Sequence, residues 1–365
     1  MVQNFMNKIP DCLEKLGFDN WFQNKIDVTK SNEFQIARII TVNKNSFVVS
    51  NGKNDIYAEL RGKFLFESDS SIDFPTVGDW VYVQLFDEDS FAIIHEILSR
   101  KSLLKRKTSS KKIEYQLIAA NIDKAIIMQS LDSNYNIRRL ERYLVIINES
   151  NITPIIFLSK SDLVTQDEIE KKKNDIYRII PNINIAAFSN NSVSDVEIIK
   201  THFHSFETYC LLGSSGVGKT TLLNNLIHQE LYKTQPIREK DGRGRHTTSR
   251  RELIVLENGA MLVDNPGMRE LGIISAESGL DDTFNEIVDL ANQCRFTDCT
   301  HTIEEGCVIL KGLEEGTISK ERYQNYIKML KESLYNEMSY FEKRQKDKKF
   351  GKFIHSVMKH KKDKE

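Results

Sequence analysis

Residues 213–220 read G-S-S-G-V-G-K-T, which fits the spacing G-x-x-x-x-G-K-[ST] of a phosphate-binding loop. Glycines at these positions free the backbone, whose N–H groups can then surround phosphate oxygens. Lys219 would reach the β- and γ-phosphates, and Thr220 would offer its hydroxyl to Mg²⁺. The apolar run 209–212 predicts a strand before the loop, and the run from Thr221 predicts a helix whose N-terminus faces the phosphates. The predicted nucleotide-binding residues are Gly213, Ser214, Ser215, Gly216, Val217, Gly218, Lys219, Thr220 and Thr221.

A second phosphate-contacting element lies further along the chain. Residues 264–267 supply D-x-x-G directly after an apolar run that predicts a strand. In that arrangement Asp264 holds Mg²⁺ through water, and the N–H of Gly267 contacts the γ-phosphate. The loop 241–248, rich in glycine and charge, lies between the two elements, and either Thr247 or Thr248 within it is predicted to ligate Mg²⁺.

The choice between guanine and adenine depends on a third element. Guanine recognition normally uses N-K-x-D, whose aspartate accepts hydrogen bonds from N1 and the exocyclic amine, a donor pair that adenine lacks. Ser159, Lys160, Ser161 and Asp162 follow a predicted strand and fit this pattern except that Ser159 replaces asparagine. Serine can make one of the bracing hydrogen bonds of that asparagine. We therefore predict that Asp162 reads guanine and that Lys160 packs along the base, the alternative being a surface turn capped by Asp162.

Hydrolysis needs a polar group that orients water. Many GTPases place glutamine one residue after D-x-x-G, but Met268 stands there and cannot do so. His246 is the predicted substitute. Alternatively, His246 is an exposed loop residue without a catalytic role, or it contacts RNA. We expect slow turnover that a partner accelerates.

Three cysteines and a histidine cluster near the C-terminal third. Cys294, Cys299, His301 and Cys307 have the short loop spacing of a Cys₃His site. Such a set closes a tetrahedral shell around Zn²⁺ and leaves no open position, which predicts a structural zinc. The two remaining cysteines, Cys12 and Cys210, are predicted to be free thiols.

Two regions with different sequence patterns must position these residues. Short runs rich in β-branched and aromatic residues, separated by turn residues, predict five strands between residues 34 and 98. They indicate a small closed barrel of the OB type, with an SH3-like barrel or a sandwich fragment as alternatives. Before it, residues 5–16 favour one amphipathic helix, and after it residues 99–112 read as a basic linker.

From residue 121 strands and helices alternate. This alternation predicts a mostly parallel sheet with helices on both faces and ligands at the carboxyl ends of its strands. Strands are expected at 125–130, 153–159, 184–189, 209–212, 251–256 and 259–264, and helices at 137–150, 166–179 and from residue 221. Beyond residue 272 the pattern becomes helical and polar, with long charged helices at 319–349.

Composition and charge limit the class of protein. No apolar run is long enough to span a bilayer, and the N-terminus lacks the layout of a signal peptide, so we expect a cytoplasmic protein. The net charge of −1 hides two basic segments, because 100–112 holds seven cations and no acid, and 341–365 holds ten cations against four acids. Together with a nucleotide site, they favour an anionic polymer such as RNA as a partner.

The order of the elements is unusual, because the base-reading element precedes the phosphate-binding loop. A parallel sheet tolerates such reordering, and the chain resembles the circularly permuted GTPases, specifically the RsgA/YjeQ family of small ribosomal subunit biogenesis GTPases. The stretches that carry the resemblance are 60–62, 77–79, 121–124, 142–144, 213–220, 246–248, 264–267 and the cysteine cluster.

The resemblance implies GTP hydrolysis, with His246 as the catalytic residue, by a monomeric switch that binds rRNA late in small-subunit (30S) maturation and leaves after hydrolysis. It implies an N-terminal extension (1–34), an OB-fold barrel (35–105), a permuted GTPase domain (106–274) and a zinc-binding helical domain with a basic tail (275–365). The alternatives are a permuted GTPase acting on the large subunit, an ATP-dependent RNA-binding enzyme and a non-catalytic RNA-binding module.

Overall fold

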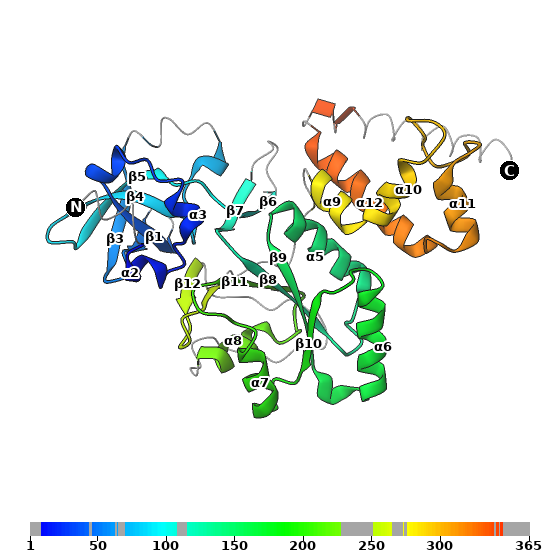
Figure 1. Cartoon of the computed structure of the whole chain (residues 1–365), viewed down its shortest axis with the longest axis horizontal. Helices are drawn as coiled ribbons and strands as arrows, with labels where there is room; N and C mark the ends of the chain where they lie inside the picture. Colours follow the sequence, from blue (N-terminus) through cyan, green and yellow to red (C-terminus); the bar gives the residue numbers. More distant parts are fainter. Residues whose placement is uncertain are drawn as a thin grey trace, which may run out of the picture. The chain divides into compact units, whose positions relative to one another are not determined.

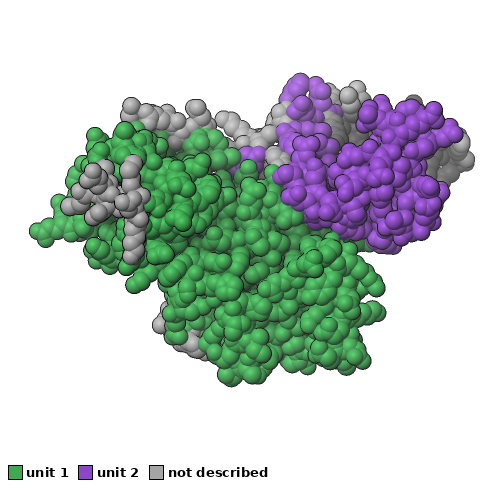
Figure 2. Space-filling view, in the orientation of Figure 1, with its two compact units in different colours: residues 1–105, 117–271 green, residues 106–116, 272–365 purple. Residues whose placement is uncertain are grey.

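The computed structural model describes residues 9–43, 46–62, 64, 70–107, 115–227, 251–264, 273, 276–338, 341–342 and 344–345. The chain divides into two compact units, residues 1–105 with 117–271 and residues 106–116 with 272–365 (Figure 2). Within the described ranges, no helix combines the length and the hydropathy that a membrane crossing requires.

The N-terminal strands close into a barrel. The strands are β1 (Gln35–Val42), β2 (Phe47–Ser50), β3 (Asp55–Leu60), β4 (Trp80–Phe86) and β5 (Phe91–Ile97). They are hydrogen-bonded in the order β1-β2-β3-β5-β4, and a β1–β4 pairing closes the ring. Only the β3–β5 pair is parallel, as in an OB-type barrel. The predicted five-stranded barrel is therefore confirmed, and inward-facing residues such as Ile39, Val49 and Val81 fill its core.

The segment before the barrel packs on it. Its elements are the short helices α2 (Asp11–Glu14), α3 (Asn20–Gln23) and η1 (Lys30–Asn32). The predicted helix over 5–16 is shorter, because α2 ends at Glu14 and residues 1–8 lie outside the described part. Phe18 and Phe22 are buried against Trp80, with ring centroids 4.8 and 5.9 Å from it.

The basic segment after the barrel is not only a linker. β6 (Leu103–Lys107) pairs with β7 (Tyr115–Ala120) in a two-stranded sheet. Leu104 in β6 is fully buried. The many charges around it in the sequence made this buried position hard to predict. The prediction of a linker over 99–112 was wrong for residues 103–107.

The central sheet carries the phosphate-binding loop. Its strands are β8 (Lys124–Ser130), β9 (Thr153–Ser159), β10 (Asn184–Phe188), β11 (Thr208–Gly213), β12 (Arg251–Val255) and β13 (Met261–Asp264). They lie in the order β10-β9-β8-β11-β13-β12. Figure 1 shows this sheet, in which β13 carries no label. The first five run parallel, and β12 runs antiparallel to β13. The mostly parallel sheet is as predicted.

Helices cover this sheet. They are α5 (Ile137–Glu149), η3 (Ser161–Leu163), α6 (Gln166–Tyr177), α7 (Val193–Lys200) and α8 (Lys219–Ile227). Ile126 and Met128 pack with Leu222 of α8 in one cluster. The alternate residues Ala125 and Ile127 face the other side, since side chains along a strand point to opposite faces.

The barrel and the central sheet are hydrogen-bonded to each other. β1 pairs antiparallel with β12, Thr41 opposite Glu252 and Val42 opposite Arg251, so that the described strands of both form one 11-stranded sheet. The buried guanidinium of Arg38 on β1 donates to the carbonyl oxygen of Asn121 at 3.1 Å and to Thr208 Oγ1 at 2.9 Å. The barrel is thereby joined to the start of β11.

The second unit is helical. Its helices are α9 (Glu277–Thr283), α10 (Asn285–Ala291), α11 (Val308–Glu315) and α12 (Lys320–Glu337). Arg322 on α12 forms an ion pair with Glu286 on α10 and donates to the carbonyl oxygen of Thr283 at 2.8 Å. The four predicted metal ligands lie between and beside α10 and α11.

Candidate nucleotide-binding site and metal centre

The phosphate-binding loop connects β11 to α8, as the sequence predicted. Gly213 has φ 149°, and a Cβ there would lie 2.5 Å from the carbonyl oxygen of Met128 on β8. Gly218 has φ 93°, where a Cβ would lie 2.5 Å from Asn190 Nδ2. A side chain would strain the backbone at both positions, and at Gly213 it would also collide with backbone.

Side chains hold most carbonyl groups of this loop. Lys219 Nζ donates to the carbonyl oxygens of Gly213 at 2.6 Å and Ser214 at 2.7 Å. Ser159 Oγ donates to that of Val217 at 2.6 Å, and Asn190 Nδ2 to that of Gly218 at 3.3 Å. The N–H groups of residues 214–218 donate to no atom of the described residues. Unpaired N–H groups on a fixed loop form an anion-binding concavity.

The predicted base-reading element meets the loop through Ser159. This residue ends β9 and is fully buried. Its hydroxyl lies 2.6 Å from the carbonyl oxygen of Val217 and 3.4 Å from that of Gln129 on β8. The bracing contact expected of Ser159 therefore exists, and it is made to the phosphate-binding loop.

The residues after Ser159 form a tight turn. Lys160 has φ 61°, and the short helix η3 follows at once. Asp162 in η3 is exposed, and its carboxylate accepts no hydrogen bond from any residue that the structure describes. An unpaired carboxylate at the carboxyl end of a parallel sheet is available to a ligand.

Lys160 is held by a partner that the sequence did not reveal. Its Nζ lies 2.7 Å from Asp132 Oδ2, just beyond the end of β8. Burial alone would raise the pKa of Asp132, but the hydrogen bonds from Lys160, Ser130 and Asn134 outweigh burial and lower this pKa to about 2. The pair leaves the aliphatic part of Lys160 available for packing along a flat ligand.

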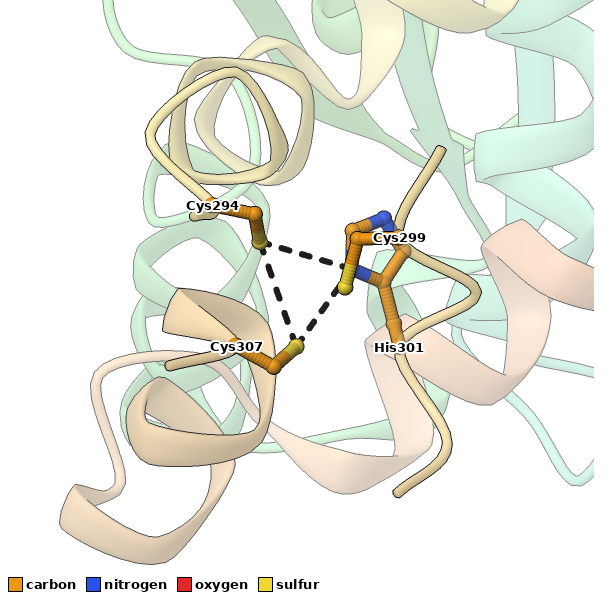
Figure 3. A group of neighbouring side chains, drawn as sticks. All are labelled: Cys294, Cys299, His301 and Cys307. Carbon is orange, nitrogen blue, oxygen red and sulfur yellow. Dashed lines mark hydrogen bonds between the residues drawn. The ribbon is translucent and has the colours of Figure 1, made fainter. Parts of the chain in front are cut away.

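The four predicted metal ligands converge (Figure 3). The ligand atoms of Cys294, Cys299, His301 and Cys307 all lie within 4.8 Å of one another. His301 Nδ1 is 3.4 Å from Cys307 Sγ and 3.6 Å from Cys294 Sγ, and the two sulfurs are 3.9 Å apart. A tetrahedral ion with metal–sulfur bonds of about 2.3 Å and metal–nitrogen bonds of about 2.1 Å separates its ligands by roughly 3.5–3.8 Å. Cys294, His301 and Cys307 thus stand close to the separations of such an ion, and Cys299 Sγ lies within 4.8 Å of each of them.

Local structure explains why these ligands converge. Cys307 caps α11, its Sγ accepting from the N–H of Leu310 at 3.4 Å. The loop before it folds around Glu304, whose carboxylate accepts from the N–H groups of Thr300 at 2.8 Å and Thr302 at 2.9 Å. These hydrogen bonds, that from the Thr300 hydroxyl first, lower the pKa of Glu304. His301 within this loop takes φ 56°.

Known proteins resemble this chain along most of its length. The RsgA GTPase family pattern matches residues 97–274. A small ribosomal subunit biogenesis GTPase RsgA 2 of Vibrio parahaemolyticus is 33% identical over 95% of this chain and 92% of its own length. One of Listeria monocytogenes is 39% identical over 89% of this chain and 90% of its own length. The chain belongs to the RsgA GTPase family.

Solved structures of related proteins have the same fold. YjeQ from Thermotoga maritima is 26% identical to this RsgA-family chain, with a TM-score of 0.61 over 82% of this chain and 98% of that one. YloQ, described as a circularly permuted GTPase, is 24% identical with a TM-score of 0.58, covering 82% of this chain and 94% of that one. The permuted order expected from the sequence is thus confirmed.

Several predicted site residues of this RsgA-family chain lie outside the described part. These are His246, Thr247, Thr248 and Gly267. Asp264 is the last residue of β13, next to β11, but its side chain is not among those described. The roles predicted for these five residues stay predictions. Thr220 and Thr221 lie half-buried in the first turn of α8, and their predicted phosphate and Mg²⁺ contacts also stay predictions.

The structure also brings residues to the site that sequence reasoning missed. Asp132 and Asn134 follow β8, and Asn190 follows β10. Asn134 Nδ2 donates to Ser214 Oγ at 3.1 Å and to the carbonyl oxygen of Ser215 at 3.3 Å. A signal existed, because ligands of a parallel sheet bind beyond the carboxyl ends of its strands, and these residues stand directly after predicted strands.

Proposed function

We propose that this chain is a GTP hydrolase that acts as a nucleotide-dependent switch in maturation of the small ribosomal subunit. The observation that carries the proposal is the 2.6 Å contact between Ser159 Oγ and the Val217 carbonyl oxygen. This contact joins the end of β9, where the turn that we propose reads guanine begins, to the loop 213–220, although 58 residues separate Ser159 and Val217 in sequence. Such adjacency is what binding of one nucleotide at both elements requires.

Guanine would be selected by the exposed carboxylate of Asp162. This carboxylate can accept hydrogen bonds from N1 and the exocyclic amine of guanine together. Adenine would leave it facing an acceptor, which carries a large penalty once the site is closed to water. Lys160, Ser161 and the buried Ser159 would support the base, with the stem of Lys160 along its face.

The triphosphate would bind along residues 213–221. The unpaired N–H groups of the loop would surround its oxygens, and Lys219 would reach the β- and γ-phosphates. Mg²⁺ would be held by Thr220, by Asp264 through water and by Thr247 or Thr248, and when bound it neutralises charge that develops during phosphoryl transfer. Gly267 would contact the γ-phosphate.

Hydrolysis breaks the bond between the γ-phosphorus and the bridging oxygen, with water as the nucleophile and GDP and phosphate as products. Met268 offers no polar group to that water. We propose that His246 orients it. If so, His246→Ala will reduce kcat and leave the affinity for GTP within about twofold of wild type; unchanged turnover would exclude this role.

The Cys₃His cluster would hold one Zn²⁺. Thiolate and imidazole ligands suit this ion, and four protein ligands leave no position for substrate, so its role would be structural. The metal would fix the loop 294–307 against α11.

The small ribosomal subunit is the partner suggested by the names of the relatives and by the positive charge of one segment of the chain. Relatives similar along nearly the whole chain are named small ribosomal subunit biogenesis GTPases. The basic segment 100–112 would contact rRNA phosphates, and such binding weakens steeply with salt. We further propose that the chain acts as a cytoplasmic monomer that leaves the subunit after hydrolysis. The proposed domains are a 1–34 extension, a 35–105 barrel, a 106–274 GTPase domain and a 275–365 zinc-binding domain.

One experiment tests this function directly. GTP hydrolysis should be measured with purified small subunits, with large subunits and with neither, and GTP and ATP affinities compared. We expect slow turnover alone, strong stimulation by small subunits only and clear preference for GTP. Equal stimulation by large subunits, full-speed turnover alone, or equal binding of ATP would each contradict the proposal.

A further inference from the structure

A continuous chain of polar contacts connects the guanine-reading turn to the phosphate-binding loop. Lys160 Nζ lies 2.7 Å from Asp132 Oδ2, and Asp132 Oδ1 accepts from the N–H of Asn134 at 2.9 Å. Asn134 then donates to Ser214 Oγ at 3.1 Å and to the carbonyl oxygen of Ser215 at 3.3 Å. The segment after β8 thus bridges the two elements that the proposed function assigns to base and phosphates.

The orientation of the Asn134 amide is determined by Arg139 on α5. Arg139 Nη1 lies 3.0 Å from Asn134 Oδ1. A guanidinium can only donate, so the amide atom that faces it must be the oxygen. The amide nitrogen therefore faces the loop, where it has two acceptors.

The contact with Ser215 has a consequence for the next residue. In a trans peptide the carbonyl of one residue and the N–H of the next point in opposite directions. Holding the Ser215 carbonyl toward Asn134 therefore aims the Gly216 N–H away from Asn134. That N–H donates to no described residue and is one of the groups available to a phosphate.

The hydrogen bond from Asn134 matters because, among the described residues, other side chains hold the neighbouring carbonyl groups of the loop but not that of Ser215. Lys219 holds the carbonyls of Gly213 and Ser214, and Ser159 holds that of Val217. Ser215 itself is exposed, and Asn134 Nδ2 is the donor that its carbonyl has among the described residues. Without Asn134 the peptide between Ser215 and Gly216 could rotate, and its N–H would lose its direction.

We propose that Asn134 is a positioning residue for the proposed GTPase reaction, orienting the Ser215–Gly216 peptide for the β-phosphate, with Arg139 fixing the amide. The inference rests on the proposed function and extends it to the segment between β8 and α5. Through Asp132 and Lys160 the same segment connects occupancy of the base site to the shape of the phosphate site.

The test compares binding of GDP and GMP, since GMP lacks the β-phosphate. Asn134→Ala should weaken GDP binding about tenfold, roughly the loss of one hydrogen bond to a charged group, and GMP binding less than twofold. Asn134→Asp should weaken GDP binding at least as much, because the carboxylate still accepts from Arg139 but cannot donate to Ser215. Arg139→Ala should cause a smaller loss of the same kind.

Two matched variants control for general effects. Asn174→Ala removes an exposed asparagine of α6, and Arg138→Ala removes the exposed arginine beside Arg139. Both should bind GDP and GMP like wild type. Melting temperatures without nucleotide should accompany every titration.

The outcomes separate the inference from the proposed function. If wild type binds neither GDP nor GTP, the proposed function fails and this inference with it. If wild type binds both but Asn134→Ala matches Asn174→Ala, only the inference fails. Equal losses for GDP and GMP, or normal GDP binding by Asn134→Asp, would also overturn it, because a phosphate-positioning role predicts neither.

Discussion

The hydroxyl of Ser159 donates a 2.6 Å hydrogen bond to the carbonyl oxygen of Val217. One buried side-chain atom thereby connects β9, which leads into the turn proposed to read guanine, with the loop 213–220. Ser159, which stands where the N-K-x-D pattern has asparagine, thus still makes a contact to the loop with a shorter side chain.

Ser159→Ala should weaken GTP binding without unfolding the protein. It removes a buried donor and leaves the Val217 carbonyl without that partner, which costs about 1–2 kcal/mol and lowers affinity by about tenfold. Titration with a fluorescent guanine nucleotide measures the effect. Ser133→Ala, at an exposed serine, is the control, and equal affinities for the two variants would contradict the prediction.

Gly213→Ala should abolish measurable nucleotide binding. The new Cβ would lie 2.5 Å from the Met128 carbonyl oxygen at a φ of 149°, and backbone on both sides cannot move freely. Gly62→Ala is the matched control, because its Cβ would meet no atom of the described residues within 4 Å. Calorimetric titration of both with GDP provides the measurement. Retained binding by Gly213→Ala would mean that the loop tolerates another conformation.

The sequence predicted the fold and the main site elements because their signals are local. The loop 213–220, the strand before it and the cysteine spacing are each readable within a few residues. Asp132, Asn134 and Asn190 were missed because each is an ordinary polar residue whose role arises only when β8, β10 and β11 lie side by side. The β1–β12 pairing was missed for the same reason, since it joins segments about 200 residues apart.

Asp132→Asn should reduce stability in a pH-dependent way. The pKa of Asp132 in the folded protein, about 2, lies below its ordinary value of 3.8, so its contribution is fully present above pH 4 and is lost as the pH falls toward 2. This difference in pKa corresponds to at most about 2 kcal/mol of unfolding free energy, because Asp132 is partly exposed and solvent weakens its interactions.

Urea unfolding of wild type and Asp132→Asn at several pH values checks this. The stability difference should be greatest at neutral pH and should shrink between pH 4 and pH 2. Asp175→Asn, which breaks an exposed pair with Arg178, should show little difference at any pH. A constant difference for Asp132→Asn across this range would be inconsistent with the ion pair to Lys160.

Removal of the metal should affect the second unit selectively. We expect one Zn²⁺ per chain by elemental mass spectrometry, absent in Cys307→Ser and retained in Cys12→Ser. The ligand Cys307 stands at the start of α11, so loss of the metal there should reduce helical circular dichroism, although serine can still cap the helix. Chelation that leaves the helical signal unchanged would argue against a structural role.

Arg38→Met should destabilise the first unit by about 3 kcal/mol. Arg38 is 1% exposed and donates to several carbonyls, including those of Gly78 and Asn121, which would lose that buried partner. Burial lowers the pKa of Arg38 to about 10, still charged at neutral pH. Urea denaturation measures the change, with Arg178→Ala, at an exposed arginine, as a control near zero. A loss below 1 kcal/mol would indicate that these carbonyls find other donors.

The pairing of β12 with β1 has a practical consequence for any shortened form of this protein. If the first hundred residues were removed, Glu252 and Arg251 would lose their partners Thr41 and Val42, and β12 would become the outer strand of the sheet. An exposed edge of unpaired N–H and C=O groups recruits strands from other molecules. A GTPase fragment without its barrel should therefore self-associate. The barrel strand β1 would thus keep the GTPase domain soluble, although it takes no part in binding the nucleotide.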